Sequence, residues 1–191
     1  MKKTLIILIL FYSFFTFASA ETKRIISGNN DAKITIIAYE SLTCSHCANF
    51  HSDVYPKLKK EYIDTGLAKI EFRHFPLDIA AFNASKIAQC KSDQSLEILK
   101  SLYSNQQVWI KGGTVEEVNN NLEKFIKKEG FKVDFEKCLN NKEIEDFVLN
   151  DRIEGTKKYK VNATPTIIIN DKKFEKTLNY KNLKKSLEKL I

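Results

Sequence analysis

The chain of 191 residues is poor in glycine, proline and cysteine. It contains 6 Gly, 3 Pro and 4 Cys. So few glycines and prolines exclude a collagen-like or low-complexity chain, and a hydrophobic content of 43% excludes a disordered one. Four cysteines are too few for a scaffold held together mainly by disulfides. The composition therefore indicates a folded globular domain in which a few cysteines have specific tasks.

Long apolar runs are also absent, except near the start of the chain. Lysines at positions 2 and 3 precede a mostly apolar run over residues 5–17, and residues 18–20 read Ala-Ser-Ala. This is the layout of a cleaved secretory signal. A membrane-spanning helix, the alternative, needs about 18 or more apolar residues. We expect cleavage after Ala20 and export of the remaining chain.

Charge of one sign is not strongly concentrated. The chain has 31 Lys and Arg against 24 Asp and Glu, a formal net charge of +7, and two of these positive charges belong to the expected signal. A small surplus spread along the chain does not indicate nucleic-acid binding.

The hydrophobic pattern of the first part predicts a strand, a helix and a second strand. Residues 33–39 form a β-branched and aromatic run typical of a buried strand, and residues 68–75 alternate like another. Between them, apolar residues recur at helical spacing, with Pro56 expected to kink the helix. This order predicts a βαβ unit with parallel strands.

The rest of the chain predicts a helical block followed by a return to strands. Residues 78–159 show helical periodicity and no strand pattern, whereas residues 166–169 and 173–176 read as strands and residues 180–190 as a closing helix. Strands on both sides of the block predict one α/β core with an inserted all-helical subdomain. The expected division is signal 1–20, first part of the core 21–77, helical insertion 78–158 and second part of the core 159–191.

Two of the cysteines, Cys44 and Cys47, lie where the first predicted strand gives way to the helix. Unpaired backbone N–H groups and the positive end of the helix dipole stabilise a thiolate at such a place and lower its pKa. His46, between the cysteines, can add a positive charge or a hydrogen bond. Stabilising the thiolate favours the reduced form, so the disulfide becomes a stronger oxidant.

Metal sites are the alternative explanation of the Cys-x-x-Cys spacing. His51 would supply a third zinc ligand, but no second ligand pair follows, because the other two cysteines lie in the helical block. A c-type haem site needs histidine directly after the second cysteine, where Ala48 stands. We therefore expect redox chemistry and neither a metal nor a cofactor.

Three segments resemble the landmarks of DsbA-like thiol:disulfide oxidoreductases. They are residues 41–51 (SLTCSHCANFH), 72–77 (FRHFPL) and 161–166 (VNATPT), in the family's order. The resemblance implies a thioredoxin fold, Cys44 as the exposed attacking cysteine, Cys47 as its buried resolving partner and Pro165 as a cis-proline beside them. It also implies that the backbone of Thr164 pairs with an extended segment of the substrate.

The sequence departs from the family pattern at three positions. Ser45 replaces a proline of the best-known member, which leaves the redox potential open, and Thr164 replaces its valine. Ala38 stands where related proteins carry a buried acid that moves the resolving cysteine's proton. Residues 38 and 40 share one strand face, so we expect Glu40 to take over that role. A solvated carboxylate at the strand end is the alternative.

Cys90 and Cys138 both fall in the helical block. In an exported protein we expect them to form a structural disulfide, which chain-entropy arithmetic values at about 4 kcal/mol at most for a loop of this length. The alternative is two buried free thiols. His51 and His74 are expected to be surface or packing residues.

Together these features predict an exported, periplasmic thiol:disulfide oxidase that introduces disulfide bonds into other exported proteins through Cys44 and Cys47. The expected partners are reduced or unfolded exported proteins and, from the family, a quinone-linked membrane protein that reoxidises the pair. The short stretch before the first predicted strand favours a monomeric oxidase. The alternatives are a disulfide isomerase or reductase, and a non-catalytic peptide- or metal-binding module.

Overall fold

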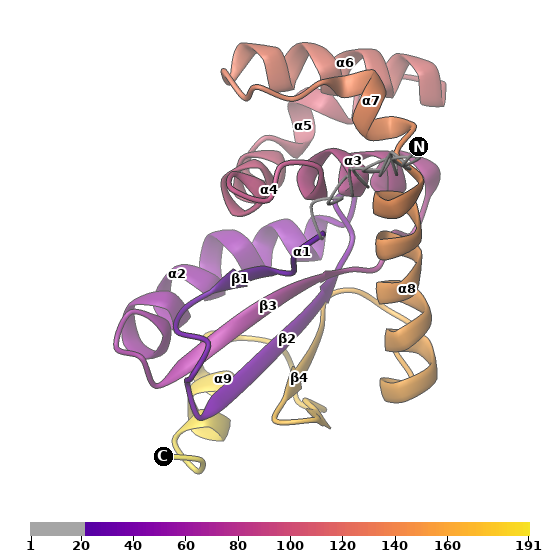
Figure 1. The fold of residues 1–191 in the computed structure, drawn as a ribbon. Coiled ribbons are helices and arrows are strands. Elements are labelled where there is room, and N and C mark those ends of the chain that lie inside the picture. The colour runs from indigo at the N-terminus through magenta and orange to yellow at the C-terminus, as the bar shows by residue number, and fades with distance from the viewer. Residues whose placement is uncertain (1–21) are drawn as a thin grey trace, which may run out of the picture.

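A computed structural model describes residues 22–191, so the expected signal lies outside the described residues. Five strands form one sheet in the order β1-β3-β2-β4-β5, in which β2 and β3 are parallel and the other neighbours antiparallel. The parallel pair confirms the predicted βαβ unit, and the sheet with its helices confirms the thioredoxin fold (Figure 1). The strands are β1 (Ile25–Ser27), β2 (Ile34–Glu40), β3 (Ala68–His74), β4 (Thr166–Ile169) and β5 (Lys172–Lys173).

The sheet differs from the sequence prediction at its two edges. The short strand β1, which pairs with β3, falls in a segment for which no strand was expected. At the other edge, β5 has two residues instead of the four predicted for residues 173–176. Both strands are too short to produce a hydrophobic alternation, and they exist because a longer neighbour offers a free edge for pairing.

The helix after Cys44 is interrupted, as predicted, near Pro56. The segment consists of α1 (Ser45–Asn49), a π-helical turn η1 (Phe50–Val54), α2 (Tyr55–Leu58) and a second π-helical turn η2 (Lys59–Ile63). Proline has no N–H to donate to the preceding turn, which accounts for the irregularity before Pro56. The closing helix α9 (Tyr180–Leu187) is shorter than predicted and packs on α2.

Alternate residues of β2 face two different layers. Ile36 and Ala38 belong to the main core, which also holds the apolar residues of α1, α2 and α9. Ile37 and Tyr39 belong to a smaller cluster with Tyr159 at the end of α8. Helices therefore cover both faces of the sheet, and the face that carries Ala38 is the one on which Glu40 follows.

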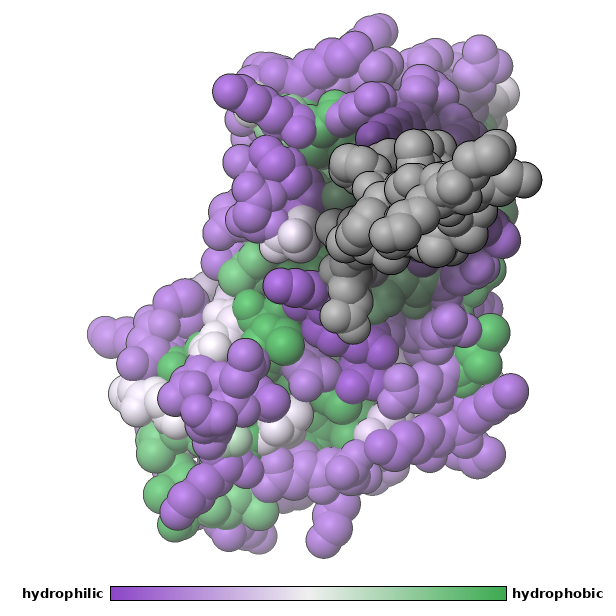
Figure 2. Space-filling view, in the orientation of Figure 1, coloured by the Kyte–Doolittle hydropathy of each residue, from purple (hydrophilic) through white to green (hydrophobic). Residues whose placement is uncertain are grey.

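Between β3 and β4 the described chain forms only helices. These are α3 (Ile79–Gln89), α4 (Ser95–Ser104), α5 (Gln106–Trp109), α6 (Val115–Lys128), α7 (Phe135–Leu139) and α8 (Lys142–Tyr159). Thr114 and Glu117 form a capping box at the start of α6, as the Thr-x-x-Glu spacing of residues 114–117 predicts. Hydrophilic residues cover the outer side of α6 (Figure 2), while its apolar side faces the main core. Among residues 22–191, no helix has the length and apolarity that crossing a bilayer requires.

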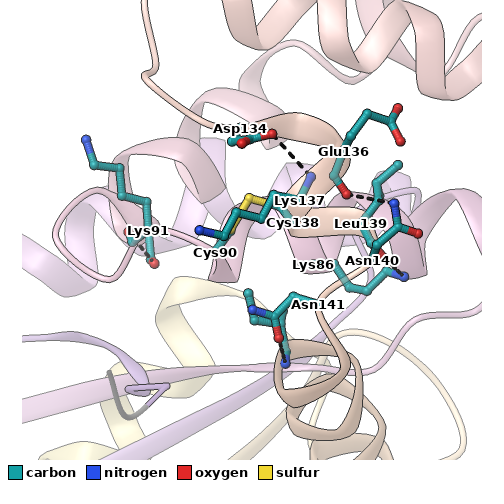
Figure 3. The surroundings of a disulfide bond; sticks show 12 residues. Lys86, Cys90, Lys91, Asp134, Glu136, Lys137, Cys138, Leu139, Asn140 and Asn141 are labelled. Atoms are coloured by element: carbon teal, nitrogen blue, oxygen red, sulfur yellow. Dashed lines mark hydrogen bonds between the residues drawn. A yellow bond between two sulfur atoms is a disulfide. The ribbon is translucent and has the colours of Figure 1, made fainter. Parts of the chain in front are cut away.

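A disulfide joins the end of α3 to α7 (Figure 3). Cys90 and Cys138 are bonded, with their Cα atoms 5.6 Å apart, and they are 48 positions apart in the sequence. Lys86 of α3 donates a hydrogen bond of 2.6 Å to the carbonyl oxygen of Leu139 beside it. The disulfide and this hydrogen bond hold α7 against α3, the first helix of the helical block.

Candidate active site

Cys44 lies directly after the loop that follows β2, at the start of α1. The Cys44 thiol donates a hydrogen bond of 3.3 Å to the carbonyl oxygen of Thr164, which comes from the loop before β4. The Thr164–Pro165 peptide bond is cis, the geometry that the family resemblance implies. Segments far apart in the sequence thus meet at this sulfur, because β4 pairs with β2 in the sheet.

The surroundings of Cys44 stabilise its thiolate. The Cys47 thiol, the Thr164 side chain and the backbone N–H groups of Cys47 and His46 lower the pKa of Cys44 from 9.0 to about 5, although partial burial opposes them. His46 is exposed and contributes through its backbone. The predicted contribution of its imidazole has no counterpart among the hydrogen bonds of the described chain. Cys44 remains accessible enough to react.

Cys47 has the opposite character. It is fully buried, and burial, the neighbouring Cys44 and the charge of Glu40 all raise the pKa of its thiol. Both cysteines are free in this structure. The pair therefore combines an accessible sulfur that ionises easily with a buried sulfur that keeps its proton, which suits stepwise thiol–disulfide exchange.

Glu40 is buried, and its charge acts on Cys47. Only 3% of the residue is exposed, so the alternative of a solvated carboxylate is wrong. Its Oε2 atom lies 2.8 Å from Nε2 of His51, whose side chain is 5% exposed. The sequence left open whether His51 and His74 are surface or packing residues. Both are packing residues: His51 contacts Glu40, and His74 is hydrogen-bonded to Gln89.

Besides His51, two further residues shape the site and were not assigned to it from the sequence. Gln106 of α5 donates hydrogen bonds of 2.7 Å to the carbonyl oxygen of Leu42 and 3.0 Å to that of Cys44, and so fixes the loop from the helical block. The ring of Tyr103 stacks on His51. Helical spacing from Cys47 could have placed His51 under the pair, whereas nothing in the sequence points to Gln106.

A groove of about 420 Å³ runs beside Pro165. It extends from α1 past the loop before β4 to the segment preceding α9, and its lining includes His46, Phe50, Asp53, Thr164, Pro165 and Leu178. In the described part of the chain, no three His, Cys, Asp or Glu side chains are grouped to hold a metal ion.

Comparison with known proteins places this chain in a family. The thioredoxin family model matches residues 20–189. A putative protein-disulfide oxidoreductase of Rickettsia bellii is 31% identical over 147 residues, which cover 75% of this chain and 55% of that protein. Disulfide bond formation protein D of Bacillus subtilis is 28% identical over 172 residues, or 85% of this chain and 74% of that protein.

A solved structure extends the similarity to three dimensions. The crystal structure of alpha-DsbA1 of Wolbachia pipientis has a TM-score of 0.78 and 30% identity, and the match covers 90% of this chain and 92% of that one. This chain spans only about half the length of the Rickettsia relative, 55% of it. The matched family model, these relatives and this structure show that the chain belongs to the DsbA-like thiol:disulfide oxidoreductases of the thioredoxin family.

Proposed function

We propose that this protein is an exported oxidase that transfers its Cys44–Cys47 disulfide to reduced proteins. The observation that carries the proposal is the asymmetry of the pair. Cys44 is accessible and has a pKa lowered to about 5, whereas Cys47 is buried and has a raised pKa. The low pKa of Cys44 stabilises the reduced form of the pair. The Cys44–Cys47 disulfide is therefore a strong oxidant, which is readily reduced by the thiols of a substrate.

The exchange starts from the disulfide form. A substrate thiolate attacks the Cys44 sulfur, the Cys44–Cys47 bond breaks, and Cys47 leaves with the bonding electrons and takes up a proton. A second substrate thiolate then attacks the substrate sulfur of the mixed disulfide. Cys44 leaves as a thiolate, which its low pKa favours. The substrate has gained a disulfide and the pair has gained two electrons.

Glu40 supplies and removes the proton of Cys47 in this proposal. A buried thiol with a raised pKa cannot leave or attack without a nearby group that exchanges its proton. Glu40 is buried and lies close enough for its charge to raise the pKa of Cys47. It follows Ala38 on the same face of β2, which supports the role expected from the sequence.

The substrate segment binds beside Pro165. The groove there is open along the loop that contains Thr164 and Pro165. An extended segment of the substrate lies in this groove and forms backbone hydrogen bonds with Thr164, as a strand does when it pairs with the edge of a sheet. The substrates are reduced exported proteins, the protein works in the periplasm as a monomer, and a quinone-linked membrane protein reoxidises Cys44 and Cys47. These partners rest on the family resemblance.

The reduction potential of the Cys44–Cys47 pair tests the proposal. Equilibration with glutathione buffers should give a value of about −120 to −180 mV, and a value near −270 mV, as for thioredoxin, would reassign the protein as a reductase. Transfer of the disulfide to a reduced, unfolded model protein, compared with reshuffling of a scrambled one, separates oxidase from isomerase. A Cys90→Ser/Cys138→Ser variant is the control that attributes the potential to Cys44 and Cys47.

A further inference from the structure

The imidazole of His51 and the carboxylate of Glu40 form a buried pair. Nε2 of His51 is 2.8 Å from Oε2 of Glu40, and the two side chains are 5% and 3% exposed. Of the three histidines in the chain, His74 bonds an amide oxygen of Gln89 and His46 is exposed. His51 is thus the histidine that contacts a carboxylate within the described chain, and water does not compete for this contact.

Aromatic rings hold the imidazole in this position. The ring of Tyr103 stacks on His51 with centroids 4.1 Å apart and planes inclined by 18°. Phe72 of β3 lies 5.1 Å away and Tyr55 of α2 lies 5.6 Å away, measured between centroids. A ring enclosed on these sides has little freedom to turn, so Nε2 stays directed at Glu40.

The two oxygens of the Glu40 carboxylate have different surroundings. Oε2 is bonded by His51, whereas Oε1 is buried and has no hydrogen-bond partner among the described residues. A buried polar atom without a partner costs about 1–3 kcal/mol and calls for an explanation. The charge of Glu40 raises the pKa of both the Tyr103 hydroxyl and the Cys47 thiol, and of these two groups Cys47 is the one that must gain and lose a proton during exchange.

We propose that His51 is a positioning residue for this proton transfer. By donating its Nε2 proton to Oε2, it fixes the carboxylate of Glu40 and leaves Oε1 to take the proton of Cys47 and to return it. During reoxidation Cys44 first forms a mixed disulfide with the oxidising partner. The Cys47 proton then moves to Oε1, the Cys47 thiolate attacks the Cys44 sulfur, the bond between Cys44 and the partner breaks, and the partner leaves as a thiolate. The inference rests on the role proposed for Glu40 and assigns the residue that orients it.

Two successive thiol reactions separate this role from the reactivity of Cys44. The probe is an aromatic disulfide, dithiobis-nitrobenzoate, added in equal amount to the reduced protein. Cys44 attacks it and releases one coloured thiolate, and Cys47 then attacks Cys44 and releases the second. Cys90 and Cys138 are bonded to each other and do not interfere, so the two phases belong to Cys44 and Cys47.

Three variants carry the test. His51→Phe keeps a ring to stack on Tyr103 but has no N–H. It should slow the second phase by about tenfold, less than the roughly 10²–10⁴-fold that a general base itself contributes, because His51 orients the base and does not take the proton. His51→Gln restores an N–H donor and should recover most of that loss. His74→Gln, which replaces a buried histidine outside the pair, is the matched control and should leave both phases within about twofold of the parent protein.

The outcomes distinguish this inference from the proposed function. A first phase that is unchanged, with a slow second phase in His51→Phe and rescue in His51→Gln, supports it. An unchanged second phase in His51→Phe, a His51→Gln variant as slow as His51→Phe, or a parallel loss in both phases would overturn it and leave the oxidase proposal standing. A missing first phase in the parent protein would overturn both.

Discussion

The hydrogen bond from Cys47 is the largest single cause of the low pKa of Cys44, and removing it gives a quantitative prediction. Cys47→Ala deletes the donor, whereas Cys47→Ser keeps an O–H donor at the same fully buried position. A hydrogen bond to a charged group contributes about 1.5–3 kcal/mol, or roughly one to two pKa units. Because Cys44 is partly exposed, water replaces some of the lost stabilisation, and we expect a rise of about one unit in Cys47→Ala.

The assay is the pH dependence of alkylation of Cys44 by iodoacetamide, checked by the ultraviolet absorbance of the thiolate. In both variants Cys44 is the remaining free thiol, since Cys90 and Cys138 are bonded. The parent pKa should be about 5. The Cys47→Ser value should lie closer to it than the Cys47→Ala value. Equal pKa values in the two variants would refute the reasoning, because the backbone N–H groups would then account for the stabilisation by themselves.

Four other predictions concern the same molecule. The pKa of Cys44 is lower in the folded protein than its value of 9.0 in the unfolded chain, so the thiolate stabilises the reduced protein fully above pH 9 and this stabilisation is lost as the pH falls to about 5. The free energy of unfolding of the reduced protein, measured between these pH values, should rise with pH by up to about 1.4 kcal/mol per unit. The Cys44–Cys47 disulfide form is the control and should lack this slope. Glu40→Gln should slow turnover at least about tenfold while leaving the pKa of Cys44 nearly unchanged, and an unaltered rate would contradict its role. Thr164→Val removes the side-chain hydroxyl of Thr164, which lowers the pKa of Cys44, and should raise that pKa measurably. Cys90→Ser/Cys138→Ser should lower the unfolding free energy by up to about 4 kcal/mol without changing the first phase of thiol exchange.

The sequence predicts those parts of the fold whose patterns are local. The strand before Cys44, the parallel strand after the helix and the capping box at Thr114 each follow from a few neighbouring residues. Strand β1 could not be predicted, because three residues carry no periodicity and its formation depends on the edge of β3.

The interior of the site shows the same limit. The reactive cysteines are recognisable from their spacing, but the contact between Glu40 and His51 depends on how η1 packs against β2. Asp151 is a stronger case: it is fully buried in a largely polar helix and pairs with Arg24, far away in the sequence. The residues next to Asp151 in the sequence do not indicate a buried charge, because its partner Arg24 comes close to it only when the sheet has folded.

The separation of Cys44 from Thr164 determines when the site is completed during synthesis. The two residues are 120 positions apart, and β4, which brings Thr164 to the sheet, pairs with β2 only after the whole helical block has been made. A nascent chain that emerges N-terminus first therefore carries Cys44 and Cys47 long before Cys44 receives its contacts from Thr164. Until Thr164 is in place the Cys44 thiol lacks the part of its acidity that Thr164 provides, so a larger fraction of Cys44 stays protonated in an unfinished chain than in the finished protein.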